Sequence, residues 1–385
     1  MLYLTGIVID LFLVVLLASK RNKSEADVIL TVWLFLIGLH LFLFYLFVTK
    51  RYYEYPLMLG LGIPFPLLHG PFLFLYTSSL TQQVNHGVLR FLHFLPFVLA
   101  YLLMLPFFFS PAEHKIYTYE HQGSAYQWIL FPLHLAIIIS GILYVVLSLG
   151  KLSQHRKNIE NQFSNTDKIN LNWLRYLIFG MAVIWIAVIF TSDAYIYATV
   201  VVYVFFIGFF GIKQTAVFAP NSPVPPMEVP PGELADEDVH GQSAAGIPEE
   251  KADVHKIKYL KSGLSGKDQE EIHDMLNRLM EQKKPFTNPD LTLGEMAEQL
   301  DVHPNNLSQV INSVAQKNFY DYINSRRVEE FIYLAGRPEN QQFTLLSIAY
   351  ECGFNSKSSF NRNFRRITGL SPSDYLKHQR GDSAD

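Results

Sequence analysis

The fold of the C-terminal part is decided by one stretch, Gly353-Phe-Asn-Ser-Lys-Ser-Ser-Phe-Asn-Arg-Asn-Phe-Arg-Arg-Ile-Thr-Gly-Leu-Ser-Pro-Ser-Asp-Tyr375. A short amphipathic helix ends at Gly353, the chain turns, and a second helix begins at Ser356. Phe360, Phe364 and Ile367 follow at spacings of four and three, so we expect them on the inner face of that second helix. The pattern predicts a helix-turn-helix over residues 344–367.

The opposite face of this second helix carries hydrogen-bond donors and cations. Side chains of this kind contact base edges and phosphates when a helix enters the major groove of DNA. The residues on this face are Lys357, Ser358, Asn361, Arg362 and Arg365. We predict that they bind DNA.

A similar pattern occurs upstream, over residues 291–312. An apolar stripe that ends at Leu300 predicts a first helix, and Pro304 follows the turn at a position where its missing N–H costs nothing. The polar face of the following helix carries Asn305, Ser308, Gln309 and Asn312. Amides and hydroxyls suit base edges, and Asn and Gln suit adenine. Because residues 291–312 contain no Lys or Arg, we expect this unit to contribute selectivity more than affinity.

Residues 319–335 read as one helix between the two units. At about 1.5 Å per residue, a helix of this length spans about 26 Å. Such a rod could hold the two recognition helices near the roughly 34 Å repeat of adjacent major-groove faces. We therefore predict that one chain reads two successive grooves.

A longer signature joins these features across residues 256–380. It consists of Met296-Ala297-x-x-Leu300, Leu307-Ser308, Arg327, Ile348-Ala349, Gly353-Phe354, Phe360-x-Arg362-x-Phe364 and Gly369-x-x-Pro372. This signature resembles the AraC/XylS family of transcriptional regulators. The resemblance implies that the polar positions of both recognition helices face bases. The chain departs from the family at Phe331, where a small Ala is usual, and at Ala315-Gln316-Lys317, which lacks the Gly usual before the linking helix.

The chain before residue 213 is unusually apolar for a DNA-binding protein. Seven runs are long enough to cross about 30 Å of hydrocarbon: 2–19, 28–48, 56–78, 91–109, 126–149, 172–191 and 194–212. The first run is not expected to be a signal peptide, because its cations follow it. We predict an all-α protein with a seven-helix transmembrane bundle (1–213), a Pro-rich acidic linker (214–255), a DNA-binding domain (256–380) and a disordered tail (381–385).

Cations in the loops predict the orientation of this bundle. The loops after the first, third and fifth runs carry eight Lys and Arg residues, whereas those after the second, fourth and sixth carry three. Lys and Arg favour the cytoplasmic side of a membrane. We therefore expect a multi-pass protein of a bacterial inner membrane, with its N-terminus outside and its DNA-binding domain in the cytoplasm.

The linker changes composition abruptly. Residues 219–250 contain seven prolines and seven acidic residues, without Lys or Arg, which predicts a disordered tether. A chain of this length has a root-mean-square reach of about 30 Å. Two interpretations stay open: a solvated linker, or an acidic competitor that folds onto the basic second unit in the unstimulated state.

Ionisable side chains lie near the middle of several apolar runs, where they cost free energy. They are Asp10, His40, His69 and His134. Because histidine titrates near physiological pH and binds polar ligands or metals, these residues are candidates for intramembrane sensing. The alternative is that each one bonds to a neighbouring helix or snorkels toward the interface.

Enzymatic signatures do not occur in the sequence. We find no phosphate-binding glycine loop, no paired metal-ligand spacing and no nucleophile elbow, so we expect no enzymatic activity, metal or cofactor. Cys352 is the only cysteine, which excludes an intrachain disulfide.

We interpret the chain as a one-component transcriptional regulator whose membrane half senses an unidentified signal. The expected partners are promoter DNA, RNA polymerase, the lipid bilayer, a second copy of the chain and an unidentified ligand. Two alternatives stay open. The chain could be a membrane transporter or membrane enzyme with an attached regulatory DNA-binding domain, or the spans could serve only as an anchor.

Overall fold

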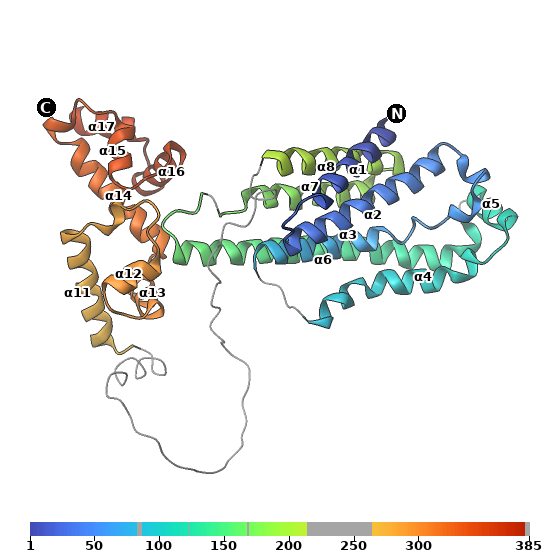
Figure 1. Cartoon of the computed structure of the whole chain (residues 1–385), viewed down its shortest axis with the longest axis horizontal. Coiled ribbons are helices and arrows are strands. Elements are labelled where there is room, and N and C mark those ends of the chain that lie inside the picture. Colours follow the sequence, from blue (N-terminus) through green and yellow to red (C-terminus); the bar gives the residue numbers. More distant parts are fainter. Residues whose placement is uncertain (83–86, 122, 168, 214–263, 382–385) are drawn as a thin grey trace, which may run out of the picture. The chain divides into compact units, whose positions relative to one another are not determined.

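The computed structural model describes residues 1–82, 87–121, 123–167, 169–213 and 264–381. Their secondary structure is helical, without a strand in these ranges, which confirms the all-α fold (Figure 1). The described residues form two compact units, one of residues 1–155 and 171–213 and the other of residues 156–170 and 264–381. The expected linker, the tail beyond Gly381 and Lys168 of a cationic loop lie outside the described residues.

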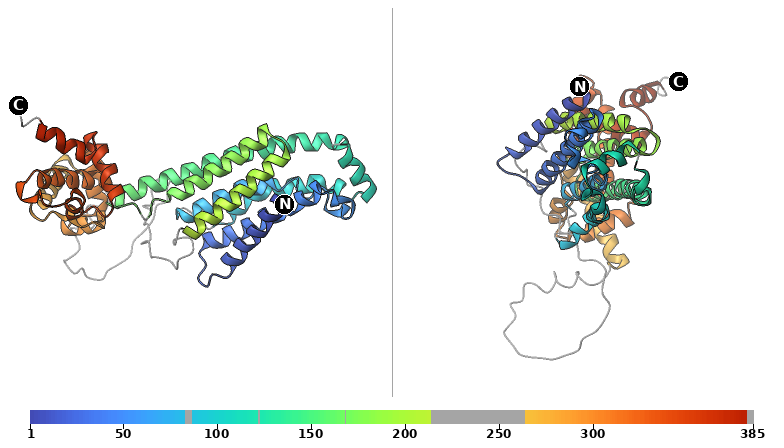
Figure 2. Two further views of the ribbon diagram at one scale, coloured as in Figure 1. Left: turned by 90° about the horizontal axis from the view of Figure 1, so that it is seen from above. Right: turned by 90° about the vertical axis from the view of Figure 1, so that its right-hand side faces the viewer.

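The first unit is a bundle of helices. Within it, α1 packs along α2 and α8, and α7 packs along α8 (Figure 2). The α-helices are α1 (Leu2–Ala18), α2 (Glu25–Val48), α3 (Pro66–Leu80), α4 (Leu95–Phe108), α5 (Ala112–Glu120), α6 (Gln127–Gln162), α7 (Asn172–Phe190) and α8 (Asp193–Lys213). The last turns of α6, from Arg156, belong to the second unit.

Five helical segments in the described residues are long and apolar enough to cross a membrane. They are Glu25–Val48, Leu89–Phe108, Ser124–Gln162, Asn172–Phe190 and Asp193–Phe210. These segments match five of the seven predicted runs, and the first run forms the shorter apolar helix α1.

The third predicted run, 56–78, differs from the expectation. Its first part forms the 3-10 helix η2 (Pro56–Met58) and turns, and only Pro66–Leu80 is α-helical. Gly60 has a positive φ of 80°, which ends regular helical hydrogen bonding there. Pro64 and Pro66 then lack the N–H groups that a continuous helix would need.

The outer surface of the bundle carries many large apolar side chains. Trp33, Leu41 and Leu174 are fully buried. Val8 is 65% exposed, Phe131 is 73% exposed, and many other Leu, Val, Ile and Phe side chains face outward. Water solvates such a surface poorly, whereas hydrocarbon solvates it well. The composition of this surface favours a lipid environment.

The second unit contains two small cores joined by one helix. Its α-helices are α11 (Gly266–Gln282), α12 (Leu293–Gln299), α13 (Pro304–Ser313), α14 (Phe319–Ala335), α15 (Leu345–Glu351), α16 (Lys357–Thr368) and α17 (Pro372–Gly381). Helices α11 to α13 share one core with the N-terminal half of α14. Helices α15 to α17 share a second core with its C-terminal half. As predicted, α14 is one continuous helix that connects two helix-turn-helix units.

The two departures from the family pattern have clear structural counterparts. Phe331 is fully buried, with its ring centroid 4.7 Å from that of Phe360 and 5.5 Å from that of Phe364. Gln316 takes the positive φ of 51° that a glycine would adopt most readily. The side chain of Phe331 therefore fills the second core.

The position of Ile367 on α16 differs from the prediction. Ile367 is 40% exposed rather than on the inner face. Asn363 is buried instead, because its Nδ2 donates to the Tyr320 hydroxyl at 2.8 Å. A hydrogen bond to α14 thus holds the amide of Asn363 in the interior, whereas the apolar spacing had predicted Ile367 there.

Candidate nucleic-acid interface and helix-bundle cavity

The first helix-turn-helix unit is built by local backbone chemistry. Helix α12 begins with a capping box, in which the Thr292 hydroxyl accepts from the Glu295 N–H at 3.2 Å and the Glu295 carboxylate accepts from the Thr292 N–H at 2.9 Å. The turn contains Asp301 with a φ of 53°. Helix α13 then begins after His303, whose Nδ1 accepts from the Asn305 N–H at 3.2 Å. These contacts fix where α13 starts.

The predicted reading residues of α13 share one face of the helix. Asn305, Gln309 and Asn312 are exposed and Ser308 is half-buried. The Asn312 side chain donates to the Ser308 hydroxyl at 3.3 Å. The opposite face of α13 is buried in the first core. The four polar groups can therefore reach a ligand together, and their contact with bases stays a prediction.

The second unit depends on a glycine at its turn. Gly353 has a φ of 94°, and a Cβ there would overlap the Phe286 carbonyl oxygen and the backbone of Thr287. Helix α16 follows, with the Ser356 hydroxyl accepting from the Ser359 N–H at 3.1 Å. The five reading residues predicted on this helix are all exposed: Lys357, Ser358, Asn361, Arg362 and Arg365. Their contact with DNA also stays a prediction.

Two further arginine side chains on α14 and α16 are engaged within the protein. Arg366 forms an ion pair with Asp321 at 2.5 Å and donates to the Asn363 side-chain oxygen at 3.0 Å, so it ties α16 to α14. Arg327 on α14 is 2% exposed and donates to backbone carbonyls. Arg366 and Arg327 therefore stabilise the fold, in contrast to the cations that face outward.

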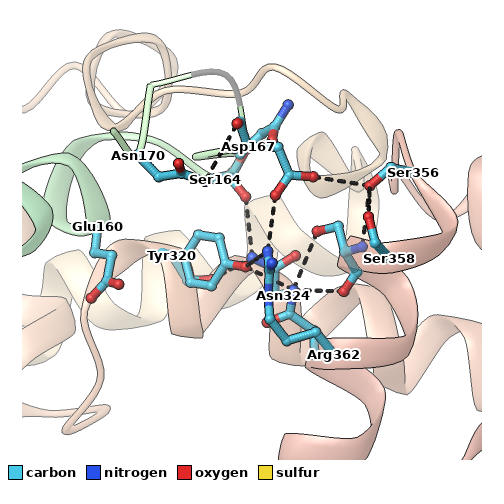
Figure 3. Close-up of polar contacts among 12 residues, drawn as sticks. Glu160, Ser164, Asp167, Asn170, Tyr320, Asn324, Ser356, Ser358 and Arg362 are labelled. Carbon is cyan, nitrogen blue, oxygen red and sulfur yellow. Dashed lines mark hydrogen bonds and ion pairs between the residues drawn. The ribbon is translucent and has the colours of Figure 1, made fainter. Parts of the chain in front are cut away.

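Arg362 contacts both α14 and the connection between α6 and α7. Its Nη2 donates to the Tyr320 hydroxyl at 3.3 Å and to the Asp167 carboxylate at 2.9 Å. Burial lowers the pKa of Arg362, but the hydrogen bonds to Tyr320 and Asp167 raise it, and the net shift is upward. The second oxygen of Asp167 accepts from the Ser356 hydroxyl at 2.9 Å (Figure 3).

The sequence did not point to Asp167 and Ser164, although both contact residues of α14 or α16. They come from a segment that lies more than 150 residues before α16, and short polar side chains in a loop have no periodic pattern. One signal could have pointed to Asp167. It is the only acidic residue in the connection 163–171 between α6 and α7.

The first unit contains a cavity of about 350 Å³ lined by aromatic and histidine side chains. His40 Nδ1 lies 3.2 Å from His69 Nε2, and the Tyr197 hydroxyl lies 2.7 Å from His40 Nε2. The Trp33 indole N–H donates to His69 Nδ1 at 3.3 Å. In neutral rings this donor leaves the proton of His69 on Nε2, so His69 donates to His40 and His40 donates to Tyr197. Four side chains from three helices thus form one directed chain of hydrogen bonds.

The other two candidate sensing residues are placed differently. His134 also lines the cavity but is exposed. Asp10 is fully buried, away from the cavity lining, with its carboxylate against Gly38, where a Cβ would overlap it. Among the described residues, no group of three or more His, Cys, Asp or Glu could hold a metal ion. The structure therefore brings together two of the four candidates, with a third at the same cavity.

Comparison with known proteins identifies the C-terminal part. Residues 296–378 match the family described as a helix-turn-helix domain. The match runs from within α12 to within α17 and so covers both recognition helices. Comparisons with curated proteins and with solved structures returned no significant match. Together with the geometry of α12 to α17, the family match shows that the chain carries an AraC/XylS-type helix-turn-helix domain at residues 296–378.

Proposed function

We propose that this protein is a membrane-bound, one-component transcriptional regulator. The observation that carries the proposal is the presence, in one chain, of an AraC/XylS-type helix-turn-helix domain and five helices able to cross a membrane. The cation distribution in the loops supports a C-terminal domain on the cytoplasmic side, where a bacterial chromosome is accessible. Its partners would be promoter DNA, RNA polymerase and a second copy of the chain.

The reading faces of α13 and α16 would play different parts in binding. Exposed Asn305 and Gln309 carry no charge, so they would discriminate between bases without adding to the salt dependence of binding. Helix α16 presents Lys357 and Arg365, which would supply most of the attraction to phosphates, and Arg362, which would contact a guanine.

The cavity in the first unit is the proposed site for sensing. Besides the two bonded histidines, its lining includes Tyr52, Tyr119 and Asp193. These three residues lie in, or at the end of, the connections after α2, α4 and α7, for which the loop cations favour the outer side of the membrane. A small molecule with an aromatic or aliphatic body and one hydrogen-bonding group would fit this lining. Such a ligand would enter from the outer side and break or extend the chain of hydrogen bonds from Trp33 to Tyr197.

The function can be tested by selecting DNA with the full-length protein in lipid nanodiscs. The protein is incubated with fragmented genomic DNA at two salt concentrations, and the bound fragments are sequenced. We expect one recurrent site with two boxes about one helical turn apart, because one chain presents two recognition helices. Binding that is salt-sensitive but shows no recurrent sequence would contradict the proposal.

Arg362→Ala should weaken binding to the selected site by about 1 to 3 kcal/mol, the usual value of an arginine that contacts a guanine. The measurement is a titration of labelled DNA with wild-type and variant protein. Lys377→Ala is the control, because it removes the same charge from an exposed position on α17. Equal losses for both variants on specific and random DNA would show that Arg362 does not read a base.

A further inference from the structure

A buried arginine connects the helix-turn-helix domain to residues 163–167. Arg327 is 2% exposed, and burial lowers its pKa to about 10, so it remains charged at neutral pH. No carboxylate forms an ion pair with it within the described ranges. Its guanidinium donates to the Phe286 and Asn288 carbonyl oxygens at 2.7 Å each. Its remaining donors need further acceptors, because a buried unpaired donor is costly.

Ser164 supplies those acceptors. Arg327 Nη1 donates to the Ser164 carbonyl oxygen at 3.3 Å, and Arg327 Nη2 donates to the Ser164 hydroxyl at 3.1 Å. The Asn324 side chain donates to the same carbonyl at 3.1 Å. Ser164 is 1% exposed as a result. The segment thus completes the hydrogen bonding of a buried charge.

The backbone of the segment is also paired. Phe163 forms an antiparallel bridge with Thr292, and the Ser164 N–H donates to the Leu291 carbonyl oxygen at 3.1 Å. Thr292 is the N-cap of α12, so the segment lies beside the start of the first helix-turn-helix unit. Main-chain pairing of this kind is a common way for a protein to bind an extended peptide.

The far end of the segment reaches the reading helix. Asp167 accepts from Arg362 at 2.9 Å and from Ser356 at 2.9 Å (Figure 3). Two carboxylate oxygens between an arginine and the hydroxyl at a helix N-terminus have the chemistry of a phosphate contact. Asp167 therefore occupies groups that DNA would use.

The two ends of the segment differ in how readily they can dissociate from the helix-turn-helix domain. Ser164 is buried with Arg327, whereas the side chain of Arg362 is 52% exposed and that of Asp167 is 25% exposed. A pair as exposed as the second is worth at most about 1 kcal/mol and is screened by salt. DNA can therefore displace Asp167 from Arg362 while the buried part of the segment stays bound.

We propose that residues 163–167 are a built-in ligand of the helix-turn-helix domain, and that Asp167 competes with DNA for Arg362 and Ser356. This proposal rests on the proposed function, because it requires α16 to bind DNA. The segment lies in the connection between α6 and α7, so a change in these helices can reach α16 through the chain itself. Displacement of Asp167 raises DNA affinity, and DNA in turn favours displacement, since coupling of this kind is reciprocal.

The first test removes the charge of Asp167 in the full chain. In nanodiscs, Asp167→Asn is expected to bind the selected DNA about two- to fivefold more tightly than wild type, the range that a partly exposed ion pair of up to about 1 kcal/mol supports. Glu160→Gln is the matched control, because Glu160 pairs with Arg156 at 3.0 Å and its removal changes the net charge equally. Equal or weaker binding by Asp167→Asn, or the same gain in Glu160→Gln, would overturn the proposal.

The second test locks the segment in place. The double variant Asp167→Cys with Ser356→Cys is oxidised, and disulfide formation is followed by mass spectrometry. The native Cys352 is fully buried and should not interfere. We expect the oxidised protein to bind DNA at least tenfold more weakly than the same protein after reduction. Saturating DNA should slow the oxidation. If the two introduced cysteines do not form a disulfide, docking of the segment is refuted. If the oxidised protein binds DNA as well as the reduced protein, competition with DNA is refuted.

These tests separate the two proposals. If the wild-type chain shows no sequence-specific binding while the double variant still oxidises, the proposed function fails and the docked segment remains. If wild-type binding is specific but unaffected by Asp167→Asn and by the disulfide, the regulator remains and the competition is wrong.

Discussion

Arginine has three different roles in the second unit, and the surroundings of each arginine determine its role. Arg327 is buried and bonded to carbonyl oxygens, Arg366 pairs with Asp321, and Arg362 lies half-exposed beside Asp167. The family signature could place Arg327 and Arg362 on their helices. It could not give their partners, because Ser164 and Asp167 come from a distant segment whose residues carry no pattern.

The uncharged residues of α13 allow base reading to be separated from phosphate attraction. Asn305→Ala and Gln309→Ala should change the preferred sequence and leave the slope of affinity against salt concentration unchanged, because neither residue releases counterions. The measurement is a repeat of the DNA selection and a salt titration for each variant. Gln299→Ala, an exposed amide at the end of α12, is the control. A uniform loss across all sequences would contradict the assignment.

The only cysteine should be chemically inert in the folded protein. Burial raises the pKa of Cys352 to about 12, so very little reactive thiolate exists at pH 8. We expect iodoacetamide to label Cys352 only after denaturant is added, as measured by mass spectrometry. The folded protein also binds the thiol proton of Cys352 more tightly than the unfolded chain does. The stability that this proton contributes to folding is therefore lost as pH rises above the pKa of the unfolded thiol, near 8.5. Equal labelling rates in folded and unfolded protein would show that the thiol is accessible.

The second helix-turn-helix core is organised around an aromatic residue of α14. Phe331 contacts Phe360 and Phe364, so all three rings determine how α16 lies on α14. The spacing of Phe360 and Phe364 predicted their inward direction, but only the structure shows that Phe331 completes the cluster. The short polar residue Asn363 reaches the interior through a hydrogen bond, which a hydrophobic pattern does not register.

Phe331→Ala should destabilise the domain by about 3 to 5 kcal/mol, although alanine is the residue usual at this position of the family. The reason is that Phe360 and Phe364 would then line a cavity that neighbouring side chains do not fill. Hydrogen exchange of the α16 amides in the full chain measures the effect. Tyr333→Ala on the same helix is the control, because Tyr333 is 54% exposed and should change exchange little. Equal protection in Phe331→Ala and wild type would show that the core can repack.

The candidate spans of the first unit were predictable to the extent that length and apolarity define them. Five segments follow the predicted runs, whereas Gly60 and the nearby prolines shorten the third helix. The meeting of His40 with His69 could not be predicted, because contacts between separate apolar helices leave no mark in their sequences. For the same reason the sequence could not distinguish Asp10 from His40 and His69, although Asp10 lies against Gly38 rather than beside the two histidines.

Reporter fusions test the orientation of this half. In a bacterial host, alkaline phosphatase fused after Glu54 or Glu120 should be active, because both residues lie in connections assigned to the outer side. Fusion after Lys213 should give an inactive enzyme, because export is needed for its disulfides. A cytoplasmic fluorescent protein at the same positions is the complementary control. Active phosphatase after Lys213 would reverse the proposed orientation.

The contact between Arg327 and Ser164 also sets an order of assembly during protein synthesis. The two residues are 163 positions apart, so at 5 to 20 residues per second Ser164 leaves the ribosome roughly ten to thirty seconds before Arg327. By then α7 and α8 have been made, and in the proposed membrane protein their insertion would determine on which side of the membrane the segment lies. A chain inserted the wrong way round would keep Ser164 from Arg327 and leave a buried guanidinium without its acceptors. In the proposed membrane protein, folding of the helix-turn-helix domain would therefore depend on correct insertion of the preceding helices.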